Sequence, residues 1–218
     1  MRILRWFVWI CIFLLVGTWV LARVTGGASR TFPVIAPDAM LHLMGRTQSA
    51  AAWAANFRPE FYAAKEKPTE PLLTIWYQVQ VQKGQYYFTY HPVWQDETHP
   101  IASVDFCYRA WRWAFYGAVA DVEALTIRVS SAGPTGIAYE TASSDAPYDA
   151  IQPKHVRIKE SIEASEIPMR FYIRTWNHLL TRQPLRDGIM HQKPALEPLT
   201  EEPYRLYKMD RRARAILW

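Results

Sequence analysis

The sequence lacks the short motifs that mark several large enzyme classes. It contains no glycine-rich loop that could cradle a phosphate, no Gly-x-Ser-x-Gly nucleophile turn and no Cys-x-x-Cys pair. Nucleotide hydrolysis, serine-hydrolase chemistry and thiol redox chemistry are therefore disfavoured. Most of the chain also lacks the concentrated basic stripe that is typical of nucleic-acid-binding domains, so we expect no nucleic-acid partner.

Cysteine is scarce, with two residues in the whole chain. Cys11 lies in an apolar N-terminal segment and Cys107 lies far beyond it, so we do not expect the two to pair. A domain without an internal disulfide permits an oxidising compartment but does not require one. We expect Cys107 to be a small buried residue, and an intermolecular disulfide is the alternative.

Charge is absent from the seventeen residues 6–22, which lie between Arg5 and Arg23. As a helix, this run would span about 25 Å, enough for a thin bilayer that the flanking arginines extend by snorkelling. Tryptophan residues near both ends suit the membrane interface. We predict an uncleaved transmembrane anchor over residues 1–24. The small residues 26–28 leave a cleaved signal peptide, followed by secretion, as the alternative.

The charges beside the anchor predict its orientation. Arg2, Arg5 and the N-terminal amine precede the apolar run, whereas Arg23 and Arg30 follow it. This small excess of positive charge favours a cytoplasmic N-terminus. We therefore expect a single-pass membrane protein with the bulk of the chain extracytoplasmic.

Apolar and aromatic residues are plentiful beyond the anchor, and their spacing predicts strands. Hydrophobic residues make up 50% of the chain and aromatic residues 14%, which favours β-structure. Residues 73–81 alternate between apolar and polar, Lys83-Gly84 suggests a turn, and residues 85–90 return as a second strand. Further extended segments are predicted at residues 104–116, 125–129, 136–141, 155–158 and 169–176. The predicted fold is mainly β and β-sandwich-like, with flanking helices.

These patterns divide the chain into four parts. Residues 1–24 form the anchor, and residues 25–70 form a linker plus a juxtamembrane helix, which is predicted over residues 38–56. Residues 71–182 form the β-rich domain. Residues 183–218 form a loop, which includes residues 184–198, followed by a basic C-terminal helix over residues 204–217.

Two acids two residues apart are the best candidate for chemistry. In a strand, Asp121 and Glu123 would project to the same face as the apolar residues that follow them. Two carboxylates at the mouth of an apolar face would repel each other and lose hydration, and Ca²⁺ or Mg²⁺ would relieve both costs. The alternative is that the strand begins at Ala124 and both acids are solvated.

The segment around these acids resembles a known family. Gly117 to Glu123 is similar to the Gly-His-Arg-His-Asp-Trp-Glu heptapeptide of the necrosis-inducing protein superfamily and matches it at Gly117, Asp121 and Glu123. Related vacuolar-sorting-type proteins keep an Asp-Trp-Glu core before a strand. Residues 171–178 resemble a later strand that ends in a histidine, here His178. The resemblance implies a β-sandwich in which Asp121 and Glu123 are metal ligands and His178 lies near the metal.

Three other groups of residues have ligand-like chemistry. The polar loop with His91, Asp96, Glu97 and His99 is expected to be solvated. The aromatic run at residues 111–116 is expected to pack in the core, with a binding platform as the alternative. At the C-terminus, a basic group forms either a solvated face or a contact with anionic lipid; its members are Arg205, Lys208, Arg211, Arg212 and Arg214.

Two functions are compatible with these features. The first is a membrane-anchored, extracytoplasmic binding or assembly domain with a protein partner, for example as a subunit of an envelope complex. The alternative is a metal-dependent hydrolase, or a protein directed at lipids or glycans, with a divalent cation at Asp121, Glu123 and His178. Because the sequence offers no convincing catalytic set, the first function is favoured.

Overall fold

A computed structural model describes Gly17 and residues 34–65, 70–143, 151–184, 188–190 and 193–209. The predicted anchor over residues 1–24 lies outside these residues, except for Gly17, as does the chain beyond residue 209. Within the described ranges, no helix has the length and apolar character needed to cross a membrane.

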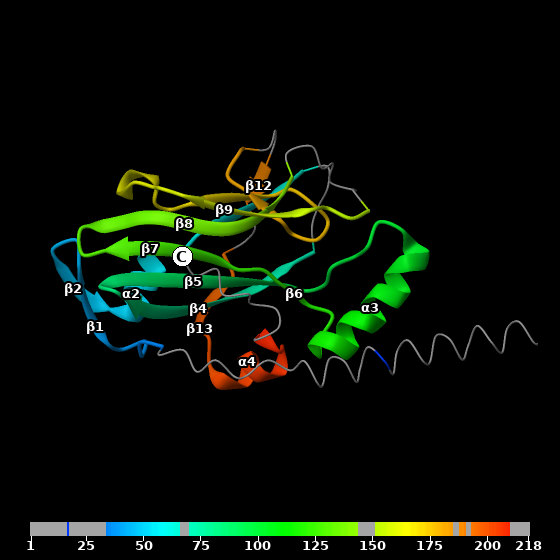
Figure 1. Cartoon of the computed structure of the whole chain (residues 1–218), viewed down its shortest axis with the longest axis horizontal. Coiled ribbons are helices and arrows are strands. Elements are labelled where there is room, and N and C mark those ends of the chain that lie inside the picture. The colour runs from blue at the N-terminus through cyan, green and yellow to red at the C-terminus, as the bar shows by residue number, and fades with distance from the viewer. Residues whose placement is uncertain are drawn as a thin grey trace, which may run out of the picture.

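The fold is dominated by a seven-stranded sheet with the order β13-β4-β5-β7-β8-β9, in which β6 also pairs with β5 (Figure 1). All neighbouring strands are antiparallel except β13, which runs parallel to β4. The strands are β4 (Leu72–Gln82), β5 (Gln85–Trp94), β6 (Asp121–Val122), β7 (Leu125–Ser130), β8 (Gly133–Ala142), β9 (His155–Glu160) and β13 (Ala195–Pro198).

The hairpin of β4 and β5 confirms the prediction from alternation. Ile75, Tyr77 and Val79 are buried on one face of β4. Lys83 and Gly84 connect the strands with backbone φ angles of 49° and 73°. Left-handed φ at both central residues is the requirement of the tight turn that matches strand twist. Local sequence therefore determines this hairpin.

A four-stranded sheet packs on the apolar face of the larger sheet and makes the fold sandwich-like. Its order is β11-β10-β3-β12. The ring of Phe61 meets that of Trp94 at 5.8 Å, and the ring of Phe171 meets that of Tyr139 at 5.2 Å. The expected mainly β fold is thus confirmed. The strands are β3 (Glu60–Ala64), β10 (Arg170–Ile173), β11 (Leu180–Thr181) and β12 (Gly188–Met190).

The other face of the larger sheet carries a smaller apolar cluster near the end of the described chain. Trp76, Val93 and Val122 pack there with Met209, which follows helix α4 (Glu201–Leu206). The ring of Tyr207 meets Trp76 edge-on at 5.0 Å. Figure 1 shows α4 beside the sheet, near the lower end of helix α3 (Ala102–Tyr116).

The predicted helix over residues 38–56 is wrong for its first half. Strands β1 (Met40–Leu43) and β2 (Arg46–Ser49) form a hairpin there, and helix α2 covers only Ala50–Asn56. Met44 and Gly45 adopt φ angles of 51° and 69°, which permit the tight turn. Leu41 and Leu43 are buried alternately, so the correct period was two.

The predicted extended segment over residues 104–116 is also wrong, because α3 occupies it. Its aromatic residues meet at helical spacing, as with Trp111 and Phe115, whose rings stack at 5.3 Å. Gly117 ends the helix with a φ of 79°. Cys107 is exposed on α3 rather than buried as predicted, because it faces away from the sheets.

Long-range pairing accounts for the remaining differences. Strands β12 and β13 lie within residues 184–198, which the sequence predicted to be a loop, and each pairs with a strand more than a hundred residues away. Helix α4 begins at Glu201, three residues before the helix predicted over residues 204–217, and residues 210–217 of that prediction lie outside the described part. Strands β3, β12 and β13 lie outside residues 71–182 and yet complete the two sheets.

Gly117→Ala should destabilise the protein more than Gly45→Ala. Both glycines have left-handed φ, so alanine costs about 1–2 kcal/mol at either position. At Gly117 an added Cβ would also lie 2.9 Å from the backbone oxygen of Leu206, whereas at Gly45 it meets nothing within 4 Å. Denaturant unfolding would measure the difference. Equal losses would show that the contact between α3 and α4 carries no stability.

Candidate functional site

An arginine is buried between two carboxylates where α3 meets the end of the larger sheet. The side chain of Arg112 is 1% exposed and lies 3.0 Å from Glu97 and 3.2 Å from Asp121. It also donates to the carbonyl of Ala120 at 3.0 Å. The hydroxyl of Tyr108, one turn earlier on α3, donates to Glu97 at 2.8 Å. These contacts fix α3 against β6 and against the loop that follows β5.

His178 extends the same chain of charges on the other side of Asp121. Its Nδ1 donates to Asp121 at 2.8 Å and its Nε2 donates to Glu70 at 3.1 Å. The ring is fully buried and stacks on Trp94, with centroids 4.5 Å apart. Burial lowers the pKa of His178, but the hydrogen bonds to Asp121 and Glu70 outweigh it and raise the pKa to about 9. His178 is therefore a cation at neutral pH.

A strained turn after β10 holds this histidine in place. His178 has a φ of 55°, which is uncommon for a residue with a side chain. Its N–H donates to the carbonyl of Thr175 at 3.1 Å, and the Thr175 hydroxyl donates to Asn177 at 2.6 Å. The same hydroxyl accepts from the N–H of Leu179 at 3.2 Å. Backbone strain of this kind persists where surrounding contacts enforce it, often at functional sites.

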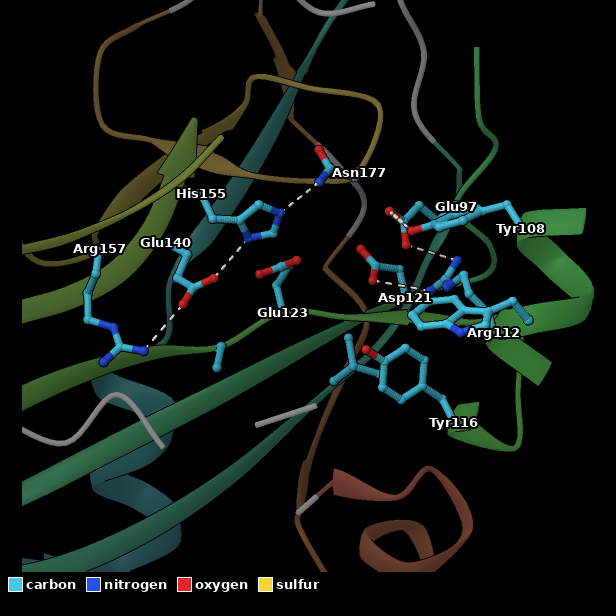
Figure 2. Close-up of a pocket in the computed structure, with 13 residues that line it drawn as sticks. Glu97, Tyr108, Arg112, Tyr116, Asp121, Glu123, Glu140, His155, Arg157 and Asn177 are labelled. Atoms are coloured by element: carbon cyan, nitrogen blue, oxygen red, sulfur yellow. Dashed lines mark hydrogen bonds and ion pairs between the residues drawn. The ribbon is translucent and has the colours of Figure 1, made fainter. Parts of the chain in front are cut away.

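The residue before His178 begins a second polar chain. Asn177 donates to Nε2 of His155 at 3.2 Å, and Nδ1 of His155 donates to Glu140 at 3.0 Å. Arg157 approaches the other oxygen of Glu140 at 3.4 Å. Figure 2 shows this chain on one side of the cleft and the Arg112 cluster on the other. The turn after β10 thus contributes one residue to each polar chain, Asn177 to one and His178 to the other.

Glu123 lies between the two walls and differs from the other acids. In the described part of the chain, no hydrogen-bond donor or cation contacts its carboxylate, which Figure 2 shows between Glu140 and Asp121. Burial raises the pKa of Glu123 well above its usual value, and the nearby carboxylates of Asp121, Glu140 and Glu97 raise it further. A cation placed beside Glu123 would therefore stabilise the ionised form of its carboxyl group.

Together these groups enclose a cleft of about 660 Å³. Its wall holds four acids and two arginines, so negative charge is in excess although the whole chain carries +5. Aromatic side chains from α3 form the side opposite Glu140. These side chains are Tyr108, Trp111 and Tyr116.

The structure brings the predicted site residues together, but not around a shared vacant position. Asp121 and His178 are in direct contact, and Glu123 is their neighbour. Both oxygens of Asp121 and both nitrogens of His178 already have protein partners. Within the described ranges, no three His, Cys, Asp or Glu side chains are arranged to hold a metal ion. Binding of Ca²⁺ or Mg²⁺ by the three residues stays a prediction.

The polar loop between β5 and α3 is more buried than predicted. His91, Glu97 and His99 are at most 7% exposed, so the expected solvated cluster is wrong. Burial lowers the pKa of His91 to about 4, which keeps this imidazole neutral. Burial also raises the pKa of Glu97 to about 7, and the repulsion from Asp121 adds to this rise. The loop is structural because it supplies one of the acids that Arg112 needs.

Several residues of the site were not predicted at all. Glu140 and His155 face each other across β8 and β9, and the alternation of these strands was the only available signal. Arg112 was hidden because its segment was predicted to be extended. Glu70 lies at the boundary of a charged loop, and the residues around it in the sequence give no sign of its contact with His178.

No family model and no curated protein matches the sequence. Similar solved structures include NLPPya in complex with glucosamine, at 10% identity and a TM-score of 0.44, covering 77% of this chain and 89% of that chain. A mutant of NLPPya matches at 10% identity and a TM-score of 0.47, covering 78% and 90%. A structure titled "Toxin fold for microbial attack and plant defense" matches at 9% identity and a TM-score of 0.39, covering 68% and 73%.

These neighbours are of the necrosis-inducing type that the heptapeptide resembles, whereas the vacuolar-sorting part of the resemblance is unsupported. A likeness at 9–10% identity concerns the fold alone and not the function of this chain.

Arg112→Met should destabilise the fold by about 3–5 kcal/mol, because it leaves Glu97 and Asp121 buried without their cation. Arg109→Met is the matched control on the same helix. The Arg109 side chain is 45% exposed and pairs with Asp96 at 2.7 Å, so its loss should cost no more than about 1 kcal/mol. Urea unfolding measures both values. Similar losses for the two variants would contradict a central role for Arg112.

Stability should fall between about pH 7 and pH 9 because of His178. Its pKa is about 9 in the folded protein, against an ordinary value of 6.5 for histidine, so its full contribution is present below pH 6.5 and is lost as the pH rises through 9. The loss should be on the order of 3 kcal/mol. Glu97, whose pKa is raised to about 7, costs stability progressively as the pH rises from 4.5 to 7 and adds little further change above pH 7.

Unfolding free energies measured from pH 7 to pH 9 test this, with His178→Gln as the comparison. The variant should be less stable at pH 7 but should show a flatter dependence above it. An equal slope in both proteins would exclude His178 as the titrating group.

Proposed function

We propose that the chain is a single-pass membrane protein whose β-rich domain lies outside the cytoplasm and acts as a binding module. The cleft beside α3 takes an organic ligand that carries a positively charged ammonium group and several hydroxyl groups. The module then serves recognition or assembly at the membrane surface, for example within an envelope complex.

The observation that carries this proposal is the unpaired carboxylate of Glu123. Every other acid of the cleft wall has a cationic or hydrogen-bonding partner, whereas Glu123 has none within the described residues and has a raised pKa. A ligand ammonium group beside it would neutralise the repulsion from Asp121 and Glu140. A cation at this position would favour the ionised form of Glu123 and so contribute to the binding free energy.

The rest of the wall suits a ligand rich in hydroxyl groups. Trp111 and Tyr116 meet edge-on at 5.5 Å and offer ring surface to the apolar face of a ligand. Glu140 and Asn177 add acceptor and donor groups on the opposite side. Polar groups that fix orientation beside aromatic surface are typical of small-molecule sites.

Binding is favoured over catalysis because the reactive groups are engaged in structural contacts. No Ser, Thr or Cys lies among the described residues of the cleft wall. His178 is fully buried behind Asp121 and bonded at both nitrogens, so it has no lone pair for a substrate or a metal. The described cleft wall thus offers no Ser, Thr or Cys nucleophile with an adjacent base.

The alternative, a metal-dependent hydrolase with a divalent cation at Asp121, Glu123 and His178, demands rearrangement. Asp121 would have to release Arg112 or His178, and the imidazole would have to lose a proton and its contact with Asp121 or Glu70. The three residues as arranged do not fit a shared cation. Glu123 alone has the free oxygens that Ca²⁺ or Mg²⁺ would use.

Glu123→Gln should abolish binding of an amino sugar and raise stability. Calorimetric titration of the protein with glucosamine should show binding, whereas glucose, which lacks the charge, should bind at least tenfold more weakly. The Glu123→Gln variant should bind glucosamine no more tightly than glucose, because it no longer offers an anion. Its unfolding free energy at pH 8 should exceed that of the wild type, because the raised pKa of Glu123 marks a destabilising charge.

Glu197→Gln is the matched control, since Glu197 is exposed on β13 and does not line the cleft. It should bind glucosamine like the wild type. Equal affinity for glucosamine and glucose, or full binding by Glu123→Gln, would overturn the proposed ligand class. Titration with Ca²⁺ and Mg²⁺ in the same series separates the alternatives: binding of either ion that depends on Glu123, without amino-sugar binding, would favour the metal site.

A further inference from the structure

The outward face of α3 exposes large apolar side chains. Phe106 is 78% exposed and Trp113 is 67% exposed. Together with Ala102 and Ala110 they follow helical spacing, so the four residues form one stripe along the helix. We call these four residues the α3 stripe. Contiguous apolar surface of this kind marks an interaction site more often than chance exposure does.

The exposure of the stripe is enforced by contacts on the rest of the helix. Arg112 points the opposite way into the Glu97 and Asp121 cluster, and Arg109 pairs with Asp96. At the C-terminal end, the ammonium group of Lys208 donates to the carbonyls of Ala114 and Phe115 at 3.2 and 3.0 Å. The helix therefore cannot rotate to bury Phe106 and Trp113 without breaking these contacts.

The chemistry of the stripe favours a bilayer over a protein partner. It holds no charged side chain, and tryptophan is enriched at the boundary between lipid headgroups and acyl chains. Phe106 and Trp113 are two helical turns apart, about 10 Å, so the stripe offers far less than the roughly 800 Å² per partner of a stable protein interface. A domain that is already tethered needs little additional area, because tethering raises the effective concentration of the surface.

The length of chain before the domain makes the contact possible. The apolar run ends at residue 22 and the predicted anchor at residue 24, whereas the domain begins with Val34, which bridges Gln80 on β4. Nine residues separate anchor and domain, with a maximum reach of about 30 Å. Figure 1 shows α3 at one end of the large sheet, where it projects away from the strands. The domain thus stays close to the bilayer and presents α3 at its periphery.

We infer that the α3 stripe rests in the interfacial layer of the bilayer that the anchor spans. This inference builds on the membrane anchoring proposed above. It deepens that proposal because Tyr108, Trp111 and Tyr116 on the same helix form one wall of the cleft. Docking of α3 places the cleft beside the headgroup layer, so its ligand is a group displayed at the membrane surface.

The exposed thiol of Cys107 allows a direct test in the full-length chain. Cys11→Ser leaves Cys107, next to Phe106 on α3, as the only thiol for a nitroxide label. The labelled protein is reconstituted into phosphatidylcholine vesicles that contain some phosphatidylglycerol. Oxygen partitions into the bilayer and a nickel chelate stays in water, so the ratio of their collision rates with the label reports its depth. The control carries Cys11→Ser, Cys107→Ser and Ser131→Cys, with the label on the exposed turn between β7 and β8.

The label at position 107 should show an oxygen-to-nickel ratio several-fold above that of the label at position 131. Adding Phe106→Ser and Trp113→Ser should return the ratio to the aqueous value while the protein still sediments with the vesicles. A wild-type ratio equal to that of the control would overturn the docking of α3. Dipolar broadening between labels would also overturn it, because α3 would then contact a second copy. Release of the whole chain from the vesicles by alkaline carbonate would instead refute the anchoring itself.

Discussion

A line of alternating charges holds together the end of the sandwich where the cleft lies. Glu70, His178, Asp121, Arg112 and Glu97 follow one another at distances of 3.1, 2.8, 3.2 and 3.0 Å between charged atoms, and Arg112 and His178 are essentially inaccessible to solvent. Burying any one of these charges alone would carry a prohibitive cost in free energy. Because positive and negative groups alternate, each inner residue has a counter-charge on both sides and each end residue has one. The five residues come from five separate segments of the chain. Their pairing fixes the loop before β4, the loop after β5, helix α3, strand β6 and the turn after β10 relative to one another.

This line of charges also shapes the cleft beside it. The two carboxylate oxygens of Asp121 contact Arg112 and His178, and these contacts stabilise the fold. Asp121 also repels the carboxylate of Glu123 and does not share a proton or a cation with it. The turn that presents His178 also presents Asn177 to His155 and Glu140. The same backbone feature therefore builds the rigid wall and orients the polar wall. Glu123 belongs to neither set, and within the described residues no donor or cation contacts its carboxylate.

How much of this was predictable depended on whether the signal was local. The alternation at residues 73–81 and the Lys83-Gly84 turn predicted the hairpin of β4 and β5, and the acids before Leu125 together with His178 predicted the centre of the site. The helix α3 was missed because its aromatic residues suggest a strand, although Trp111 and Phe115 meet at helical spacing. Glu70, Glu140 and His155 could not be found from the sequence, since each acts through a partner brought close by pairing over a long stretch of chain.

The contact from Lys208 to the last carbonyls of α3 has a consequence for the order of assembly. Lys208, which contacts the lower end of α3, lies ninety-four positions after Ala114 in the chain. Strand β13, which forms the edge beside β4, also comes late in the chain. A growing polypeptide can thus form the central hairpins before the segment that supports α3 has been made. The wall of the cleft that α3 forms therefore depends on a contact with a segment that follows both hairpins in the chain.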